Sequence, residues 1–387
     1  MATGLQTPQI PSSAPPDADP VLWLRLIRSR RVGAVTFHRL VADHGGVEGA
    51  LAALPGIAQA AGVQEYSLCP LEVVRAEMAQ ARLARAELLL WGQDGYPQAL
   101  MDLADAPPVL WAQGDTRLLA RPMVALVGAR NASSLGLRMT RRLVEGLAHA
   151  GQVVVSGLAR GIDAEAHQAA LETGTVAVQA GGVDVIYPVE NTELAVAIAA
   201  RGCRISEQPM GLVPQARHFP QRNRIVSGLA RAVVVVEAAA RSGSLITAKN
   251  ALDQGREVLA VPGHPFDARA AGCNMLLRDG ATLVRSAQDV LEAIGVQGHF
   301  MAQTPQPIEA VAVPDPLLGP VPQRRALSDI AAVHSQILAR LGPSPLAEDQ
   351  LIRDLALPPG MLSPALISLE LEGRILRQSG GLLSRVD

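Results

Sequence analysis

Three short loops rich in Gly, Ala and Ser contain the residue types that bind a phosphate group. Their sequences are GARNASS (128–134), SGLARGID (156–163) and RSGSLIT (241–247). Each joins an apolar run typical of a strand to a helical pattern, and the first turn of a helix offers unpaired N–H groups to an anion. Small residues let the backbone approach that anion closely. A tight structural turn would explain any one loop, but the three together indicate an anion site.

The most basic segment of the chain is RHFPQRNR, residues 217–224. It holds three arginines and one aromatic residue within eight positions, with no acidic residue. Arginine contacts phosphate and an aromatic ring stacks on bases, so this pattern favours single-stranded nucleic acid as a ligand. The alternative is a solvated loop whose Phe219 lies in the core.

Few titratable residues could support an enzyme. Asp163 and His167 stand four positions apart on one predicted helix face and could hold a metal, but no second His or Cys is nearby. We favour a structural pair that orients the glycine turn before this helix. Glu207 and Glu237 are isolated carboxylates at strand ends. We therefore predict no catalytic residue and no metal site.

Nucleotide-binding motifs are missing from the loops. The first loop is not GxGxxG, and no acidic residue ends the strand expected at 152–155, so a dinucleotide is disfavoured. Lys249 does not follow a GxxxxG loop, which argues against a Walker A motif and ATP hydrolysis. We predict that the protein uses no cofactor.

The elements that position these loops alternate between strands and helices from about residue 120 onward. Ser134 is the expected cap of the first helix, which stops at Gly151. This alternation predicts an α/β fold with a Rossmann-like, doubly wound parallel sheet, in which ligands bind at the carboxyl ends of the strands. The expected strands are 123–127, 152–155, 176–179, 232–236, 258–261 and 282–284, and further helices are expected near 162–173, 191–201, 244–254 and 286–294.

Smaller units flank this core, which we bound at 95–297. Residues 1–20 read as a disordered tail, and 21–90 carry a helical pattern interrupted by glycines, which suggests a SAM-like or helix-hairpin-helix domain. Proline is dense within 298–326, which is typical of an extended linker.

The last unit, 327–387, has the element order of a winged helix. We expect helices at 330–341, 346–355 and 363–373, the last with Ser363 as its N-cap, followed by two short strands around Gly380 and Gly381. The third helix is apolar and acidic, with no arginine before Arg374. Because this face would repel phosphate, we favour a protein-contact or regulatory role over reading of a DNA groove.

Composition limits the remaining classes. The chain has 387 residues, 49% of them hydrophobic, and a formal net charge of -2, so any basic surface is local. Its three cysteines are far apart without a CxxC pair, which argues against disulfides or a zinc site and favours a reducing compartment. No secretory signal or uncharged apolar run of about 18 residues occurs. We therefore expect a cytoplasmic protein that does not contact a membrane.

A series of motifs in fixed order resembles the DprA/Smf family, the DNA-processing proteins of bacteria. The resemblance covers about residues 95–290. It implies a Rossmann-like core that binds single-stranded DNA without catalysis, forms a homodimer, and loads RecA recombinase onto DNA during natural transformation. The motifs are VALVGAR (124–130), SGLARGIDAEAH (156–167), IYPVEN (186–191), ISEQP (205–209), HFPQRNRIVSGL (218–229), VVVVEAAARSGSLITA (233–248), AVPGHP (260–265) and GCNMLLRDGA (272–281).

Residue roles follow from the same resemblance. Arg130 would grip phosphate, Phe219 would stack on a base, and the loop of Ser242, Gly243 and Ser244 would close the pocket together with Thr247. The further implied DNA contacts are Ser156 and Gly157 and, in the basic segment, Arg217, Arg222, Asn223 and Arg224. One departure is Gln179-Ala180, where the family usually carries an apolar residue and Gly.

Two alternatives remain open. The core resembles more distantly the nucleotide-processing hydrolases of the lysine-decarboxylase-like group, whose PGGxGTxxE motif supplies a catalytic glutamate. Here Asn250 stands three residues after Thr247, where that glutamate would be needed, so an acid or base is absent. The other alternative is an interaction scaffold whose central pocket binds no DNA.

Overall fold

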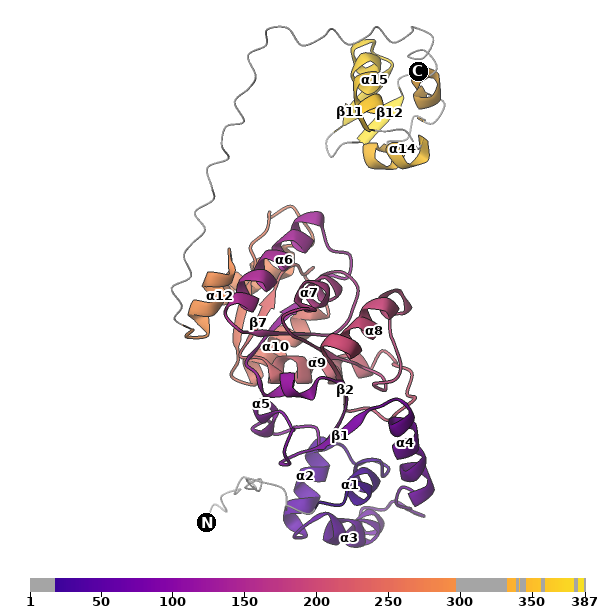
Figure 1. Cartoon of the computed structure of the whole chain (residues 1–387), viewed down its shortest axis with the longest axis vertical. Helices are drawn as coiled ribbons and strands as arrows, with labels where there is room; N and C mark the ends of the chain where they lie inside the picture. The colour runs from indigo at the N-terminus through magenta and orange to yellow at the C-terminus, as the bar shows by residue number, and fades with distance from the viewer. Residues whose placement is uncertain are drawn as a thin grey trace. The chain divides into compact units, whose positions relative to one another are not determined.

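The computed structural model describes residues 18–296, 333–338, 341, 346–355, 359–378 and 382–385. The chain divides into two compact units, residues 1–301 and 302–387 (Figure 1). The expected linker at 298–326 and residues 1–17 of the expected tail lie outside the described residues. Pro20, the last residue of that expected tail, already begins the first helix. None of the described helices is long and apolar enough to cross a membrane.

Four helices open the first unit, as the glycine-interrupted pattern predicts. They are α1 (Pro20–Ile27), α2 (Ala34–Asp43), α3 (Val47–Ala60) and α4 (Leu71–Leu83). The side chain of Asp19 caps α1 by accepting a hydrogen bond of 2.8 Å from the Val21 amide. Trp23 and Phe37 are buried in a hydrophobic cluster that also includes residues of the sheet, so these helices and the sheet share one core.

The sheet of the first unit has the strand order β1-β2-β6-β5-β4-β3-β7-β8-β9. Pairing is parallel from β6 through β9, whereas β1 and β2 are antiparallel additions. The strands are β1 (Glu87–Leu90), β2 (Val109–Gly114), β3 (Met123–Val127), β4 (Val153–Ser156), β5 (Thr175–Val178), β6 (Cys203–Ser206), β7 (Ala232–Val235), β8 (Glu257–Ala260) and β9 (Thr282–Leu283). The predicted doubly wound parallel core is confirmed; β1 and β2 were not predicted, and β6 was implied only by the placement of Glu207 at a strand end.

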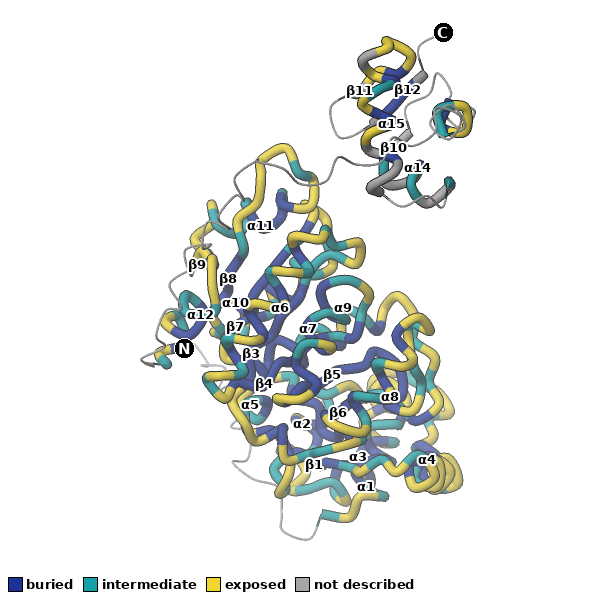
Figure 2. The backbone as a smooth tube through the Cα atoms, turned by 45° about the horizontal axis from the view of Figure 1, so that its top comes forward, coloured by how far each residue is buried: buried dark blue, intermediate teal, exposed yellow. Residues whose placement is uncertain are grey.

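Helices cover both faces of this sheet, so its central strands are buried, whereas the edge strand β9 is exposed (Figure 2). In β3, Val124 and Leu126 pack with the residues of one cluster, and Ala125 and Val127 belong to another, as the alternation of side chains along a strand requires. The first cluster includes α6 (Ser134–His149), α7 (Ile162–Ala170) and α12 (Ala287–Ala293), and the second includes α9 (His218–Leu229) and α10 (Ser244–Asp253). The remaining helices are α5 (Gln98–Met101), α8 (Thr192–Arg201) and α11 (Ala271–Arg278), with 3-10 turns at Thr116–Ala120 and Val189–Asn191.

The start of α6 corrects one expectation. Ser133 rather than Ser134 is its N-cap, and the Ser133 hydroxyl accepts a hydrogen bond of 3.0 Å from the Gly136 amide. Ser133 has the extended backbone of a cap, which lets its oxygen reach an amide three residues ahead. The helix ends before Gly151, whose φ of 70° suits a glycine.

The second unit is a winged helix, as its element order predicts. Residues 333–338 are helical, followed by β10 (Leu346–Ala347), α14 (Glu348–Leu355), α15 (Pro359–Leu371), β11 (Ile375–Gln378) and β12 (Leu382–Arg385). The strands form an antiparallel sheet in the order β10-β12-β11, so the predicted hairpin is confirmed.

Two boundaries in this unit differ from the expectations. Residues 346–347 pair with β12 instead of starting a helix. Ser363 and Pro364 lie inside α15, so Ser363 is not an N-cap. Pro359 has the fixed φ that suits a first helical turn, and burial of Leu362 and Leu366 offsets the backbone hydrogen bond that Pro364 cannot make.

Candidate functional site

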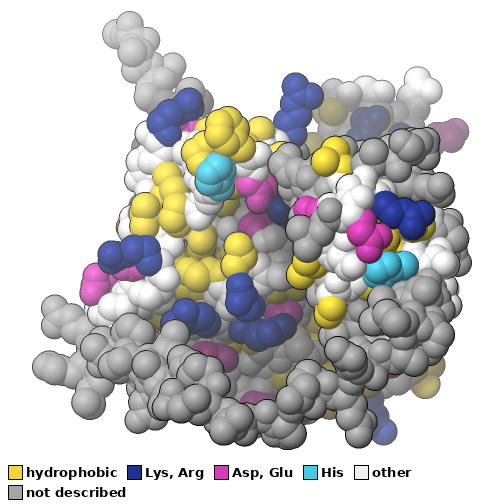
Figure 3. All heavy atoms as spheres, turned by 90° about the horizontal axis from the view of Figure 1, so that it is seen from above, with side chains coloured by type: hydrophobic (Ala, Val, Ile, Leu, Met, Phe, Trp, Pro, Cys, Tyr) yellow, Lys and Arg dark blue, Asp and Glu magenta, His cyan; other side chains and the backbone are white. Residues whose placement is uncertain are grey.

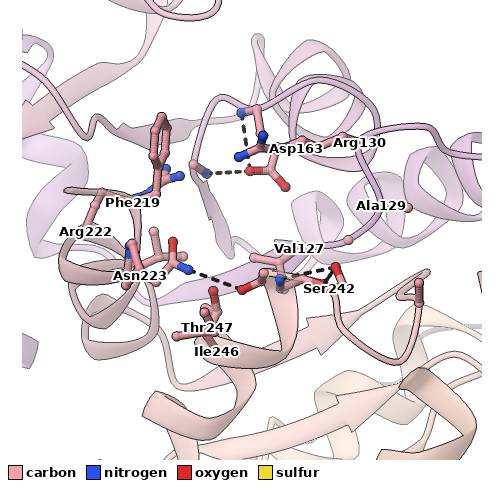
Figure 4. A pocket seen from close by; sticks show the side chains of 18 of the residues that line it. Val127, Ala129, Arg130, Asp163, Phe219, Arg222, Asn223, Ser242, Ile246 and Thr247 are labelled. Carbon is pink, nitrogen blue, oxygen red and sulfur yellow. Dashed lines mark hydrogen bonds between the residues drawn. The ribbon is translucent and has the colours of Figure 1, made fainter. Parts of the chain in front are cut away.

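The three small-residue loops meet at the carboxyl ends of β3, β4 and β7, where they line a pocket of about 940 Å³ (Figure 4). The strand order turns back between β3 and β7, so the loops after these strands diverge and leave a crevice at the sheet edge. Helix α9 forms another wall of the pocket. The predicted meeting of the loops is therefore correct, although they are separated by up to about 115 positions in the sequence.

Helix α9 contains most of the basic segment and turns one face toward the pocket. Phe219, Arg222, Asn223 and Val226 all line the cavity. Their spacing of three, four and seven residues from Phe219 is that of one helix face. Figure 4 shows the three polar or aromatic members of this set extending from the same helix. The segment is therefore helical rather than a solvated loop, and Phe219 lines the pocket instead of lying in the core.

Phe219 is half-buried and belongs to a small cluster of rings and charge. The guanidinium carbon of Arg130 lies 5.6 Å from the centroid of the Phe219 ring, within the range of a cation–π contact. The ring of Tyr187 lies 5.6 Å from that of Phe219 at an angle of 54°, and Tyr187 is 47% exposed. An aromatic surface beside a cation therefore faces the pocket.

Arg222 supplies a buried positive charge at the pocket wall. Its side chain is only 7% exposed, and its Nη1 donates a hydrogen bond of 2.7 Å to the Val178 carbonyl. Burial lowers the pKa of this guanidinium to about 10, against the opposing effect of the Asp163 carboxylate, so it stays charged at neutral pH. The Nε atom of Arg222 has no hydrogen-bond partner. A Cβ on Gly157 would lie 1.9 Å from the Arg222 Nη1, so only glycine fits there.

Asp163 and His167 hold the second loop in place, as the structural interpretation of this pair predicts. Asp163 accepts hydrogen bonds from the amides of Gly157 and Ala159 at 3.2 and 3.4 Å. The Nε2 of His167 accepts one of 3.3 Å from the Leu158 amide. Burial lowers the pKa of His167 to about 3, so the ring is neutral and can accept. The part of the chain that the structure describes contains no cluster of three metal-ligating side chains.

A carboxylate of the protein itself lies at the start of α6, where the sequence predicted that unpaired N–H groups of the first loop would bind a phosphate. Glu237 follows β7 and accepts hydrogen bonds from both the amide, at 2.9 Å, and the hydroxyl of Ser133. A carboxylate at this position complements the positive end of the helix dipole. A Cβ on Gly136 would lie 2.5 Å from the Glu237 carboxyl carbon, so the carboxylate fills the space. The amides of Ser133 and Gly136 at the helix start are therefore already hydrogen-bonded within the protein.

Nine of the twelve residues predicted as contacts line the pocket. Asn223 also donates a hydrogen bond of 3.3 Å to the Gly243 carbonyl, which ties α9 to the third loop. The side chains of Ser242 and Ser244 share a hydrogen bond of 2.7 Å. The nine are Arg130, Gly157, Phe219, Arg222, Asn223, Ser242, Gly243, Ser244 and Thr247.

The other three do not line it. The buried Ser156 hydroxyl donates to the Leu126 carbonyl at 2.6 Å, and Arg217 donates to the His218 ring at 3.2 Å. Arg224 pairs with Glu207 and Asp105. Because each helical residue turns about 100°, Arg224 points away from the face that carries Arg222.

Among the pocket residues that were not predicted as contacts are two arginines and one aromatic residue. Arg241 stands next to the predicted Ser242, and Tyr187 lies in the IYPVEN motif, so both were quoted without a role. Arg269 comes from the loop after β8 and pairs with Asp267 at 3.1 Å. Only proximity in the fold identifies it. Figure 3 shows basic and hydrophobic side chains interspersed on the face seen from above.

Comparison with known families gives three matches along the chain. Residues 87–295 match the DNA recombination-mediator protein A family, residues 17–80 the DprA-like N-terminal HHH domain, and residues 321–381 the DprA winged helix domain. Among relatives, the Smf protein of Synechocystis is 36% identical over 74% of this chain and 76% of its own length. The DprA protein of Streptococcus pneumoniae is 46% identical over 51% of this chain and 71% of its own length.

Two solved structures are similar in fold and sequence. The X-ray structure of Streptococcus pneumoniae DprA aligns with a TM-score of 0.53 and 34% identity, covering 68% of this chain and 98% of the other. The DprA of Helicobacter pylori, whose structure was solved for its single-stranded DNA binding mode, aligns with a TM-score of 0.50 and 31% identity over 54% of this chain and 95% of the other.

Proposed function

Because the chain belongs to the DprA/Smf family of DNA-processing proteins, we propose that its central pocket binds single-stranded DNA and catalyses no reaction on it. The observation that carries the proposal is the pocket face of α9, which presents Phe219 and Arg222 one turn apart. Stacking of a base on an aromatic ring contributes roughly 1–3 kcal/mol and tolerates any sequence. A nearby cation neutralises the phosphate of the same nucleotide.

The positive charge of the pocket supports a polyanionic ligand. Four arginines line it, Arg130, Arg222, Arg241 and Arg269, against the single lining carboxylate of Asp163. Asp163 already accepts two amide hydrogen bonds, and burial raises its pKa. Arg269 pairs with Asp267, so the positive charge available to phosphates rests mainly on Arg130, Arg222 and Arg241.

The same lining argues against the hydrolase alternative. No histidine lines the pocket among the described residues, and the one carboxylate holds the second loop rather than facing a substrate. Asn250 occupies the position where a catalytic glutamate would be needed in the related hydrolases. A general acid or base is therefore missing.

The wider role that we propose rests on family membership. The protein acts in the cytoplasm as a homodimer, protects incoming single-stranded DNA and loads RecA recombinase onto it during natural transformation and recombination. The proposed domains are a helical unit at 21–90, the DNA-binding core at 95–297, a linker at 298–326 and the winged helix at 327–387. The mainly apolar sequence of α15, which has one acidic and no basic residue, favours a protein contact for the winged helix over groove reading.

The test is oligonucleotide binding followed by fluorescence anisotropy across a salt series. We expect a strong preference for single over double strands. The double variant Arg130→Ala, Arg241→Ala should bind weakly, with a salt slope shallower by about 1.4 for two lost phosphate contacts. Arg117→Ala is the matched control, since this arginine is 90% exposed and pairs with Asp115 outside the pocket.

Two results would contradict the proposal. Undiminished binding by the double variant would move the DNA site to another part of the chain. Absence of binding by the wild-type protein would favour the scaffold or hydrolase hypothesis, and incubation with nucleotides would then distinguish these two.

A further inference from the structure

A second cavity of about 300 Å³ adjoins the main pocket. We call it the side chamber; its own lining residues are Leu158, Arg160, Pro188, Val189 and Glu190. The rings of Phe219 and Tyr187 line both cavities, so this aromatic pair forms their common border. Arg130, Gly157, Ala159 and Arg222 also belong to both. A strand bound in the main pocket therefore passes directly beside the chamber.

The walls of the side chamber differ in chemistry from those of the main pocket. Pro188 and Val189 give it an apolar side, and Val189 is 76% exposed. The charged groups that line the chamber alone are Arg160 and Glu190, whose side chains lie 3.6 Å apart and are 57% and 63% exposed, whereas Arg130 and Arg222 lie at its border with the main pocket. An exposed carboxylate repels phosphate, whereas apolar and aromatic walls with one donor and one acceptor suit a nucleobase.

The backbone of the chamber is held rigidly before any ligand arrives. Leu158 is buried with a φ of 56°, a left-handed conformation that costs a non-glycine residue roughly 1–2 kcal/mol. The Asn191 amide group holds it by donating to the carbonyls of Leu158 and Ala159 at 2.9 and 3.2 Å. Asp163 and His167 accept the amides of the same loop. Strain maintained by so many contacts is typical of a binding site.

We propose that the side chamber is a base subsite for one nucleotide of the bound strand. The base lies against Tyr187 with its edge toward Arg160 and Glu190, and its phosphates stay in the main pocket. The Glu190 carboxylate accepts from an exocyclic amino group and Arg160 donates to the adjacent ring acceptor, so cytosine or adenine fits better than thymine. This subsite rests on the proposed binding of single-stranded DNA.

The experiment compares short oligothymidine strands in which one nucleotide at a time is replaced by cytidine or by an abasic residue. With the full chain, cytidine at one position should tighten binding by about tenfold, since a hydrogen bond to a charged group at an exposed rim is at the weak end of its range, about 1.5 kcal/mol. An abasic residue at that position should weaken binding by about tenfold through lost stacking.

Matched variants separate the two parts of the subsite. Glu190→Gln keeps an oxygen acceptor but loses the charge, so it should weaken the preference for cytidine and leave the affinity for oligothymidine unchanged. Tyr187→Ala should make affinity insensitive to the abasic replacement, whereas Tyr187→Phe, which keeps the ring, should behave as the wild type. Thermal unfolding of each variant verifies that the fold is intact.

The outcomes distinguish failure of the subsite from failure of the proposed function. If Glu190→Gln and Tyr187→Ala bind every strand as the wild type does while Arg130→Ala with Arg241→Ala loses binding, the chamber is unused and the main-pocket proposal stands. If the wild-type protein binds every singly replaced strand as tightly as it binds oligothymidine, the proposal of a base subsite is wrong. If the wild-type protein binds no single strand, both proposals fall.

Discussion

Replacing Gly157 by alanine should destabilise the protein through one identifiable clash. The added Cβ would lie 1.9 Å from Nη1 and 2.4 Å from Cζ of Arg222, so the whole guanidinium must move. It would lose the hydrogen bond of 2.7 Å to the Val178 carbonyl. A hydrogen bond to a charged group contributes about 1.5–3 kcal/mol to the free energy of unfolding. The alanine offsets roughly 0.4–1 kcal/mol of this loss, because it restricts the unfolded chain. We expect a net loss of about 2 kcal/mol in the free energy of unfolding.

A double-mutant cycle with Arg222→Ala, measured by urea unfolding, isolates this clash. In the Arg222→Ala background the side chain that collides is gone, so Gly157→Ala should be neutral or slightly stabilising. The coupling energy should then be about 2 kcal/mol. Affinity for single-stranded DNA should also fall in the single variant, because the buried charge no longer has a fixed position.

Gly243→Ala is the matched control from the same pocket. Nothing lies within 4 Å of a Cβ at this position, and its φ of -62° suits alanine. We expect a change within about 0.5 kcal/mol. The reasoning is refuted if Gly157→Ala costs as much stability without the Arg222 side chain as with it, or if the control is destabilised equally.

Three further predictions concern residues that hold the site together. His167→Gln should flatten the pH dependence of stability. In the wild type the folded pKa of His167, about 3, lies below the ordinary 6.5, so the unfolded state binds the extra proton and the free energy of unfolding falls by up to about 1.4 kcal/mol per pH unit below 6.5. Equal slopes for variant and wild type in urea titrations at pH 5 to 7.5 would contradict this. Glu237→Gln should cost about 1 kcal/mol in thermal unfolding by weakening the anionic cap of α6, and an unchanged melting temperature would argue against that cap. Arg224→Ala should cost about 2 kcal/mol by leaving the partly buried Glu207 without this partner, yet the salt slope of DNA binding should equal that of the wild type; a shallower slope would make Arg224 a DNA contact after all.

The central sheet was predictable because its strands are short runs of buried β-branched residues between helical patterns. Val124 to Val127 and Val153 to Val155 show this pattern without any knowledge of their neighbours. The bounds of strand β6 were not predicted, although Glu207 was expected at a strand end, since its sequence CRIS mixes a charged and a polar residue with two apolar ones. Arg204 is nevertheless buried there, with its Nη2 donating to Gln113 of β2. That burial depends on a partner strand that no local pattern reveals.

The basic segment shows where the prediction of the site reached its limit. Its composition indicated phosphate contact and stacking, but a choice among Arg217, Arg222 and Arg224 requires knowing that 218–229 is a helix. Prolines and polar residues at its start obscure the helical pattern. Once the helix is known, the spacing from Phe219 selects Arg222 for the pocket face, and Arg224 turns to the partly buried Glu207.

The sequence by itself determined the alternation of strands and helices in the core, because it depends on local propensity. The alternation in turn determined the edge of the sheet at which the three loops meet, because βαβ crossovers have a fixed handedness. Tertiary structure alone decided what occupies that edge. Glu237 closes the start of α6 from 104 residues away, and Arg269 and Tyr187 join the pocket from separate loops. Such contacts between distant segments form only when the layers pack, since no local interaction between neighbouring residues specifies them.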